Sequence, residues 1–187
     1  DAQSEVCPVL ALPDTGPLLP ALSKSQRRKV VHDRHRAEHA GGVIEAVAGG
    51  AEIDEALNAL FSLHAARWAA AGQSGVLADP RVQAMHRAAA PALAAAGLLR
   101  LVTVSFGGRF VAVLLGFADG PRGYSYINGV AADVPGQSFG SMAFATLIER
   151  AVTDGAREFH FLRGEEGYKY QWGAHPTYTV RRTLRRR

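Results

Sequence analysis

The hydrophobic period of this chain changes twice, and this change limits the folds open to it. Between Ile53 and Trp68, side chains recur at the three- and four-residue spacing of one helix face, and a second helix should begin at Asp79-Pro80 and end at Gly97. Residues 98–130 hold three β-rich runs joined by glycine-rich turns, which predicts two successive hairpins. Residues 138–154 are helical again, and residues 158–162 and 177–184 read as strands.

The segment before residue 51 adds a helix and a strand. Residues 23–38 predict a polar, basic helix, residues 43–48 a short strand, and residues 1–22 an extended segment with a turn. Pro91 falls inside the second predicted helix and should kink or split it. A strand–helix–strand step after a meander gives a mixed sheet. The order therefore predicts an α/β (α+β) fold, with a mixed, mostly antiparallel sheet flanked by helices.

Length and composition favour one domain without a membrane span. We expect an N-terminal extension over residues 1–42 and a domain over residues 43–187, with no apolar run near the 20 residues of a bilayer span. Cys7 is the single cysteine, so an intrachain disulfide is excluded and a cytoplasmic location is expected. The chain begins at Asp1 rather than at a methionine, which we interpret as truncation.

Basic residues gather in two stretches, although the formal net charge is only +4. One stretch runs from Lys24 to Arg36 and the other from Arg181 to Arg187. Two interpretations stay open: solvated faces with a frayed tail, or a surface that binds the phosphates of a cofactor or of RNA. No stacking aromatics are interleaved with these arginines, so nucleic acid is not favoured as a partner.

Two local sequences resemble a known family. They are Leu63-His64-Ala65-Ala66-Arg67-Trp68 and the segment FLRGEEGYKYQWG from Phe161 to Gly173. Together with the element order, they resemble the GNAT acetyltransferases, in particular the cellulose- and exopolysaccharide-biosynthesis subgroup that is related to the FemABX aminoacyltransferases. The resemblance covers about residues 25–184.

The resemblance implies a function and an arrangement. It implies a GNAT-like fold and transfer of an acyl group from acetyl-CoA, or another acyl-CoA, to an amine or hydroxyl of a small acceptor. That acceptor would be a sugar or cell-envelope precursor of polysaccharide biosynthesis. Members usually carry a preceding GNAT-like half, so this chain would be the C-terminal half of a tandem protein, with its own preceding half as a partner.

The resemblance also places the phosphates of the donor. GNAT enzymes hold them on a Gln/Arg-x-x-Gly-x-Gly/Ala turn, because free amides at a helix N-terminus bind anions and glycine permits close approach. In this chain Gln137, Ser138, Gly140 and Ser141 occupy that turn, whereas Met142 stands where a small residue is expected. A helix start capped by Ser138 is the alternative interpretation.

The strand before this turn should line the rest of the donor site. In a GNAT fold it diverges from the strand at residues 158–162, and the pantetheine arm binds the exposed main chain between them. A backbone N–H around Asn128 to Ala131 would then polarise the thioester carbonyl. Gly129 within the strand indicates a bulge or the close approach of another backbone, unless it only relieves crowding.

Candidate catalytic groups cluster after the strand at residues 158–162. The family pattern favours Tyr168 as general acid, with Tyr170 as its rival, and Glu165 beside Glu166 offers a carboxylate base. Two structural alternatives remain: an ion pair between Glu165 and Lys169 on a helical turn, and an aromatic cluster. Because Tyr168, Tyr170 and Trp172 alternate, they would share one face of an extended segment.

We expect four residues to contact the acceptor: Arg163, Lys169, His64 and Trp172. His64 lies on an apolar helix face, where a satisfied core histidine is the alternative. His160 should face away from Phe159 and Phe161 and is a weak candidate for the base. The histidines at residues 32, 35 and 39 have no acidic or cysteine partner, so no metal site is expected. A serine-hydrolase elbow is missing from the sequence.

Two further functions remain open. One keeps the fold but uses an aminoacyl-tRNA donor, held by the basic N-terminal stretch. The other is an interaction module that has lost its donor site, which Met142 favours.

Overall fold

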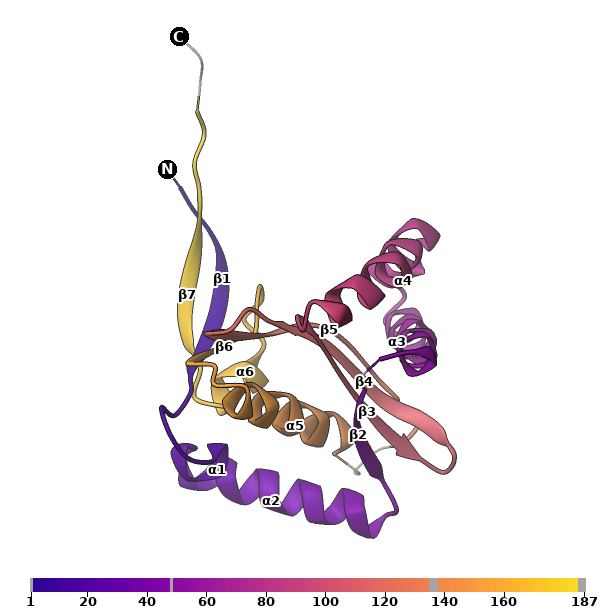
Figure 1. Cartoon of the computed structure of the whole chain (residues 1–187), viewed down its shortest axis with the longest axis horizontal. Coiled ribbons are helices and arrows are strands. Elements are labelled where there is room, and N and C mark those ends of the chain that lie inside the picture. Colours follow the sequence, from indigo (N-terminus) through magenta and orange to yellow (C-terminus); the bar gives the residue numbers. More distant parts are fainter. Residues whose placement is uncertain (1, 48, 135–137, 185–187) are drawn as a thin grey trace.

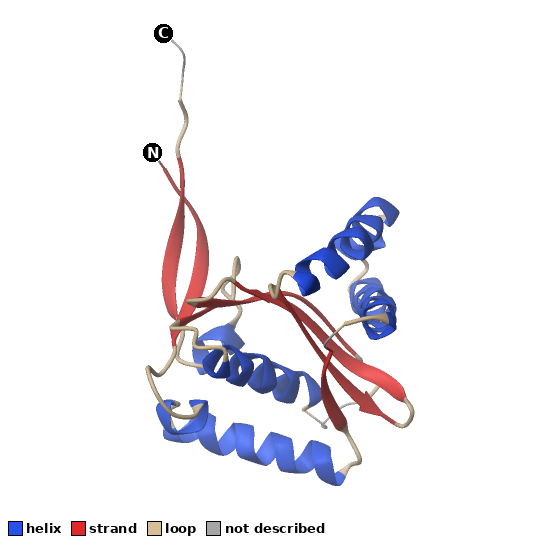
Figure 2. Cartoon of the chain, viewed as in Figure 1, coloured by secondary structure: helices blue, strands red, loops and turns tan. Residues whose placement is uncertain are grey.

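The computed structural model describes residues 2–47, 49–134 and 138–184. A seven-stranded sheet carries helices on both faces (Figures 1 and 2). The strands are β1 (Ala2–Ala11), β2 (Val43–Val47), β3 (Leu99–Phe106), β4 (Arg109–Ala118), β5 (Arg122–Val130), β6 (Glu158–His160) and β7 (His175–Arg181). The helices are α1 (Leu18–Ala21), α2 (Lys24–His39), α3 (Ala51–Ala70), α4 (Pro80–Ala95), α5 (Phe139–Thr153) and α6 (Gly167–Gln171), with a 3-10 turn η1 (Val76–Ala78).

Local sequence signals set the helix boundaries. Ser23 accepts a hydrogen bond from the Gln26 amide at the start of α2, and Asp79 accepts one from the Arg81 amide at the start of α4. Helix α4 continues through Pro91, so the predicted split of this helix is wrong. Its ends at residues 80 and 95 agree with the predicted start at Asp79 and stop at Gly97.

The sheet has the order β2-β3-β4-β5-β6-β1-β7. Strands β2 to β5 pair antiparallel in sequence order. Tight turns join β3 to β4 and β4 to β5, whereas α3 and α4 lie between β2 and β3. Helix α5 crosses from β5 to β6, and these two strands are parallel. The predicted mixed, mostly antiparallel sheet is therefore confirmed.

Both faces of the central strand β4 are buried. Ala112 and Leu114 join a core with α1, α2 and α5, whereas Val113 and Leu115 join a second core with α3 and α4. Successive residues of a strand point to opposite faces, so a strand covered on both sides is apolar throughout. This explains the uninterrupted hydrophobic run of residues 110–118.

The segment before residue 42 belongs to the same sheet and core. Strand β1 lies between β6 and β7, with Val9 opposite His160 and Val6 opposite Tyr178. Helix α2 packs against α5, where Arg34 forms an ion pair with Glu149 over 2.7 Å. The β1–β7 ribbon extends beyond the body of the molecule (Figure 1). A domain boundary at residue 42 stays a prediction.

The structure differs from the sequence prediction after β6. The segment expected to be irregular contains the short helix α6, so Tyr168, Tyr170 and Trp172 do not share one extended face. The bulge in β5 lies at Tyr126, which is the extra residue between the pairs Leu115–Ile127 and Gly116–Ser125, rather than at Gly129.

Gly129 instead marks a close approach between a strand and a helix. A Cβ there would lie 2.7 Å from Leu63 Cβ and 3.0 Å from the Leu60 carbonyl oxygen of α3. The predicted close approach of another backbone is confirmed, and it seats α3 directly on β5.

Within the described residues, no helix is both long and apolar enough to cross a membrane.

Candidate active site

Strands β5 and β6 separate soon after they meet. Their pairing covers Arg122 to Tyr124 on β5 and Glu158 to His160 on β6. After His160 the chain follows β1 instead, because the Phe161 amide donates to the Pro8 carbonyl and the Gly164 amide to the Val6 carbonyl. A gap therefore opens beside the second half of β5.

A cavity of about 530 Å³ occupies this gap. Phe144 of α5 lies at its base and contacts the rings of Phe161 and Tyr168, with centroids 6.3 and 5.3 Å away. Segments far apart in the sequence form its walls: α2, α3, the start of η1, β5, the start of α5, and α6 with the residues beside it.

The register of β5 directs backbone groups into the gap. The Ala131 amide donates to the Val111 carbonyl over 2.8 Å, so Ala131 and Gly129 turn their amides toward β4. Polar groups alternate sides along a strand, and the amides of Asn128 and Val130 therefore point away from β4. These two amides therefore face the gap that opens where β6 turns away from β5. This is the position that the sequence predicted for an amide donating to a thioester oxygen.

The start of α5 closes one end of the cavity. Gly140 and Ser141 line the wall, and a Cβ at Gly140 would lie 3.2 Å from Val130 Cγ2, so glycine permits this contact between α5 and β5. Ser138 has a left-handed conformation (φ 58°) and does not cap the helix through its side chain. Ser138 is therefore the N-cap residue of α5, as the alternative interpretation expected, but only its carbonyl and not its hydroxyl binds the helix backbone. Gln137 lies outside the described residues.

An ion pair between the exposed Lys29 and the buried Asp33 adjoins this helix start. The Lys29 ammonium binds the Asp33 carboxylate and lies 3.3 Å from Ser141 Oγ. Burial alone would raise the pKa of Asp33, but hydrogen bonds from Lys29 and from the hydroxyls of Ser141 and Ser138 hold it below its usual value. The N-terminus of α5 therefore lies beside the Lys29 ammonium and the Asp33 carboxylate.

Met142 points away from the cavity. Its side chain is 1% exposed and lies in the core between α5 and the sheet. The residue that departs from the family pattern therefore does not fill the cavity.

Tyr168 brings a phenol into the cavity from α6. Burial raises the pKa of Tyr168 to about 12, the nearby Glu166 carboxylate adds to the rise, and Arg67 partly offsets it. A thiol has a pKa near 8.5. The phenol therefore stays protonated near neutral pH, and it can donate a hydrogen bond to a group of lower pKa without giving up its proton.

Glu166, rather than Glu165, lines the cavity. Its carboxylate binds Lys169 Nζ over 2.8 Å. Burial alone would raise the pKa of Glu166, but the Lys169 hydrogen bond and the positive charges of Lys169 and Arg67 bring it below the usual value. A carboxylate of low pKa is a poor base but a good partner for a substrate ammonium.

Lys169 holds the loop that leads into α6. Its ammonium is buried and donates to the carbonyls of Leu162 (3.4 Å), Arg163 (2.9 Å) and Gly164 (3.1 Å). Leu162 adopts a positive φ of 56°, which is unfavourable for a branched residue. The predicted pair of Lys169 with Glu165 is replaced by the pair with Glu166, and the ammonium is fully engaged by protein groups.

His64 is fixed in one orientation at the far end of the cavity. The Trp68 indole N–H donates to its Nε2 over 2.9 Å, so in the neutral ring Nδ1 carries the proton. Burial lowers the pKa of His64, and the charge of Arg67 lowers it further. Gly75 fits closely over both rings, since a Cβ there would lie 2.5 Å from Trp68. The Nε2 lone pair of His64 is therefore occupied and its Nδ1–H is buried, so this histidine is a poor base.

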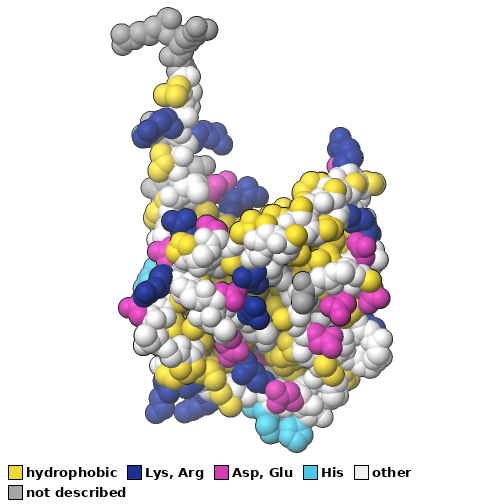
Figure 3. Space-filling view, viewed as in Figure 1, with side chains coloured by type: hydrophobic (Ala, Val, Ile, Leu, Met, Phe, Trp, Pro, Cys, Tyr) yellow, Lys and Arg dark blue, Asp and Glu magenta, His cyan; other side chains and the backbone are white. Residues whose placement is uncertain are grey.

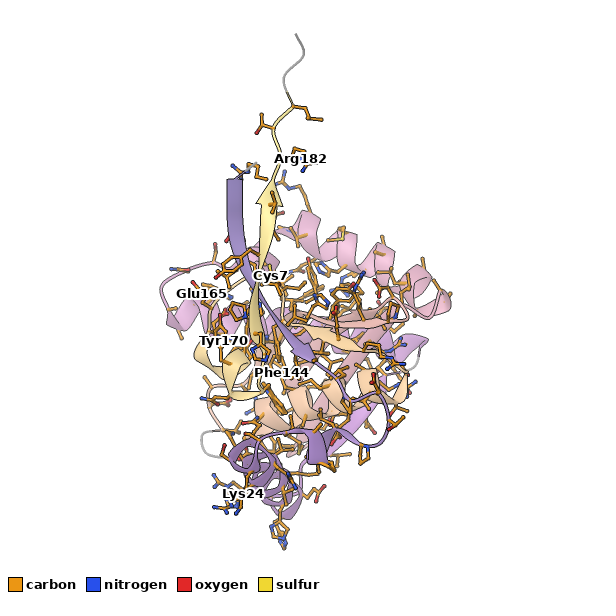
Figure 4. The ribbon with its side chains drawn as sticks, turned by 90° about the vertical axis from the view of Figure 1, so that its left-hand side faces the viewer. Cys7, Lys24, Phe144, Glu165, Tyr170 and Arg182 are labelled. Atoms are coloured by element: carbon orange, nitrogen blue, oxygen red, sulfur yellow. The ribbon has the colours of Figure 1, made fainter. Side chains whose placement is uncertain are left out.

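The structure gathers most of the residues predicted from the sequence. The cavity is lined by His64, Asn128, Val130, Gly140, Ser141, Tyr168 and Trp172. Arg163 pairs instead with Glu5 (3.7 Å), and Glu165 lies with Tyr170 beside the β1–β7 ribbon, outside the cavity (Figure 4). The sequence prediction missed Gln26, Lys29, Arg67, Tyr126, Glu166 and Gln171 as lining residues.

His160 alternates with its neighbours as predicted. Phe159 and Phe161 are buried in the core, while the His160 ring contacts Tyr124 (centroids 5.1 Å apart) and binds Glu158 over 3.0 Å. It does not line the cavity.

A second hollow of about 510 Å³ lies on the outer face of α2, lined by Lys24, Arg27, Arg28, Val31, His32 and His35. Lys and Arg side chains gather over this end of the molecule (Figure 3). One helix forms the whole hollow, whereas polar groups from several elements converge in the cleft. We therefore take the cleft as the candidate active site. Among the residues that the structure describes, no group of three or more His, Cys, Asp or Glu side chains could hold a metal ion.

The sequence profile of the acetyltransferase (GNAT) domain family matches residues 24–170. The chain belongs to this GNAT acetyltransferase family. A search of curated protein sequences finds no match. The GNAT assignment therefore comes from the family profile, which covers most of the chain, and the sheet with a parting between β5 and β6 agrees with it.

Solved structures share the fold of this GNAT domain. FemX superposes with a TM-score of 0.71 at 12% identity, covering 94% of this chain and 60% of FemX. A GCN5-related N-acetyltransferase from Kribbella flavida gives 0.53 at 18% identity, covering 95% of this chain and 55% of that protein. The C-terminal domain of a putative lysylphosphatidylglycerol synthetase from Agrobacterium fabrum gives 0.61 at 10% identity, covering 95% and 60%. The chain thus spans about 60% or less of the length of these proteins.

Proposed function

We propose that this GNAT domain transfers an acyl group from acyl-CoA, with acetyl-CoA as the donor, to an amine or hydroxyl group. The observation that carries the proposal is the parting of β5 and β6 around a cavity of about 530 Å³, with the amides of Asn128 and Val130 on its open side. An extended pantetheine arm binds such an edge by adding to the sheet.

Each end of the cleft has its own chemistry. At the start of α5, the amides of Gly140 and Ser141 and the Lys29 ammonium suit a pyrophosphate. At the opposite end, Glu166, Arg67 and His64 suit a polar acceptor. The reacting carbonyl would lie between them, near Val130 and Tyr168.

The reaction can be written in terms of these groups. The acceptor nitrogen or oxygen attacks the thioester carbon, and the amide of Val130 or Asn128 donates to the oxyanion that forms. The C–S bond then breaks while Tyr168 donates a hydrogen bond to the departing sulfur. The proton lost by the acceptor ends on the thiol through solvent in the cleft, since Glu166 and His64 are both poor bases here.

The wider setting is proposed from the sequence resemblance. We place the domain in the cytoplasm, as the C-terminal half of a tandem protein whose preceding half is its partner. The acceptor would be a sugar or cell-envelope precursor of polysaccharide biosynthesis. The segment from Phe161 to Gly173 supports this subgroup.

Titration with acetyl-CoA tests the proposal. Calorimetry should show a micromolar dissociation constant, and amide NMR should show Val130 and Gly140 among the most strongly shifted signals. Val130→Pro removes the amide that faces the gap and spares the hydrogen bonds to β4, so it should weaken binding. Absence of heat and of amide shifts at millimolar acetyl-CoA would refute the acyl-CoA donor.

One observation favours a second candidate, an aminoacyl-tRNA donor. The Asp33 carboxylate of α2 lies beside the start of α5, where its negative charge would repel a pyrophosphate. The exposed face of α2 is basic, which suits a nucleic acid. Binding of tRNA by the domain, with no binding of acetyl-CoA, would support this donor. The interaction module is less favoured, because Met142 lies in the core and leaves the cleft open.

A further inference from the structure

A small hollow lies next to the main cavity, between α4 and the sheet. It has a volume of about 90 Å³ and is lined almost entirely by apolar side chains: Met85, Ala89, Ala90, Leu93, Leu99, Leu115 and Phe117, with His86 and Tyr126. Figure 3 shows hydrophobic side chains along the upper surface of the molecule, between the β1–β7 ribbon and α4. Roughly 15 Å³ of such cavity volume holds one water-sized group, so the hollow takes about six non-hydrogen atoms.

Tyr126 joins this hollow to the main cavity, because its side chain lines both. It is the bulged residue of β5, and its ring is 44% exposed. The ring stacks on His86 (centroids 5.8 Å, interplanar angle 30°) and tilts against Phe117 (5.4 Å). A ligand that passes over Tyr126 would therefore reach both spaces.

His86 carries an unused hydrogen-bond acceptor into this apolar setting. Its Nδ1 lies 2.7 Å from the Val82 carbonyl oxygen, which can only accept, so Nδ1 holds the proton. In the neutral ring Nε2 is then a bare acceptor, and among the described residues it has no partner. The side chain is 5% exposed, and an unpaired polar atom at that depth is unfavourable.

The surrounding rings keep His86 in this orientation. Phe61 meets it edge-on, with centroids 6.1 Å apart and an interplanar angle of 73°, while Tyr126 stacks on it. A rotation that brought Nε2 to the Val82 carbonyl would only move the unpaired atom to Nδ1. The site therefore calls for a hydrogen-bond donor attached to an apolar group.

We infer that the hollow is a specificity pocket for the acceptor substrate, which inserts a short aliphatic group bearing a hydroxyl or amino donor, with His86 Nε2 accepting a hydrogen bond from that donor. This inference rests on the proposed function for its link to acyl transfer, because the reacting end of the same acceptor would lie in the main cavity. The pocket itself rests only on His86, Tyr126 and the apolar lining.

A pair of isomeric probes tests the pocket without any donor substrate. Isobutanol and diethyl ether have the same atoms, but only isobutanol donates a hydrogen bond. With histidine-labelled protein, isobutanol should move the Nε2 nitrogen signal of His86 to lower chemical shift in a saturable way. Its dissociation constant should be about five-fold lower than that of diethyl ether, as one hydrogen bond provides.

Two variants sharpen the test. His86→Phe keeps an aromatic ring beside Tyr126 and removes the acceptor, so the ratio of the two dissociation constants should fall to about one. His35→Phe replaces an exposed histidine of α2 and should leave the ratio unchanged. Equal binding of the probes by the unmodified protein, an unmoved Nε2 signal, or a proton found on Nε2 would each overturn the pocket.

The result is independent of the donor experiment. If acetyl-CoA does not bind but isobutanol selectively shifts His86, the proposed donor fails and the pocket stands. If acetyl-CoA binds and isobutanol does not discriminate, the pocket fails and the acyl-CoA proposal stands.

Discussion

The indole N–H of Trp68 donates to Nε2 of His64 over 2.9 Å, and this contact decides which nitrogen of His64 keeps its proton. Because Nε2 is occupied, the buried Nδ1 is the donor of the neutral ring, and it has no partner among the described residues. Folding thus favours the neutral histidine, which burial and the charge of Arg67 also favour.

This arrangement makes stability depend on pH. The pKa of His64 is lowered in the folded state, so below about pH 6.5 the unfolded chain binds more protons at this site than the folded one. The free energy of unfolding should therefore fall as the pH drops from 7 to 5. Urea titrations should show a shallower fall for His64→Gln, while His35→Gln, at an exposed histidine, should match the unmodified protein. Identical slopes for all three proteins would contradict this.

Tyr168→Phe should lower turnover by about 10- to 100-fold and leave the acetyl-CoA dissociation constant unchanged. The phenol donates to the leaving sulfur only as the C–S bond breaks, so its loss affects the transition state and not donor binding. Because the pKa of Tyr168 is about 12, the pH profile should show no Tyr168 ionisation up to pH 10. Steady-state kinetics and calorimetry measure both quantities.

Tyr170→Phe is the control for that experiment, because Tyr170 does not line the cavity. Equal activity of the Tyr168→Phe variant and the unmodified enzyme would remove Tyr168 from the mechanism. A loss of turnover in Tyr170→Phe, with Tyr168→Phe unaffected, would assign the role of general acid to Tyr170.

Lys29→Met should weaken acetyl-CoA binding about five-fold and leave acetyl-pantetheine, which lacks the phosphates, unaffected. The ammonium lies 3.3 Å from Ser141 Oγ at the start of α5, within reach of a pyrophosphate. Its loss should also reduce the salt dependence of binding. Lys24→Met, on the outer face of α2, is the control.

Asp33→Asn should have the opposite effect on acetyl-CoA affinity from Lys29→Met. It removes a negative charge beside the anion site while an amide can still accept from Lys29 and the serine hydroxyls, so acetyl-CoA should bind several-fold more tightly. Weaker binding would mean that Asp33 serves mainly to hold Lys29 in place.

Lys169→Met should destabilise the fold by about 2–4 kcal/mol, measured by urea unfolding. The substitution leaves three loop carbonyls and Glu166 without the ammonium that binds them, at a place where Leu162 already has an unfavourable backbone. Lys24→Met should change stability little. A loss below about 0.5 kcal/mol would show that water replaces the ammonium.

Much of the fold could be predicted because its signals are local. The change of period, the cap at Asp79 and the glycine turns each act within a few residues, and the structure has the elements where they indicate. For β1 the sequence indicated only an extended segment, with no local signal for a place in the sheet. Its residues pair with β6 and β7, more than 140 positions away, and only those partners make them a strand.

The candidate site could be predicted only in part for the same reason. The family pattern identified Tyr168, Asn128 and Gly140, which line the cavity. Alternation suggested an extended segment after β6, but the Lys169 ammonium folds this loop and brings Glu166 to the cavity in place of Glu165. Lys29 was one cation in a basic stretch, and its place beside Ser141 follows from the packing of α2 on α5.

The strand order has a consequence for how the molecule assembles. Strands β2 to β5 follow one another along the chain and can zip up while synthesis is still under way, whereas β6, β1 and β7 must bring together segments from opposite ends. The cleft lies between β5, whose partners are near in sequence, and β6, whose partner β1 lies at the other end of the chain. The cleft can therefore hold a ligand only after β6 has paired with both β5 and β1.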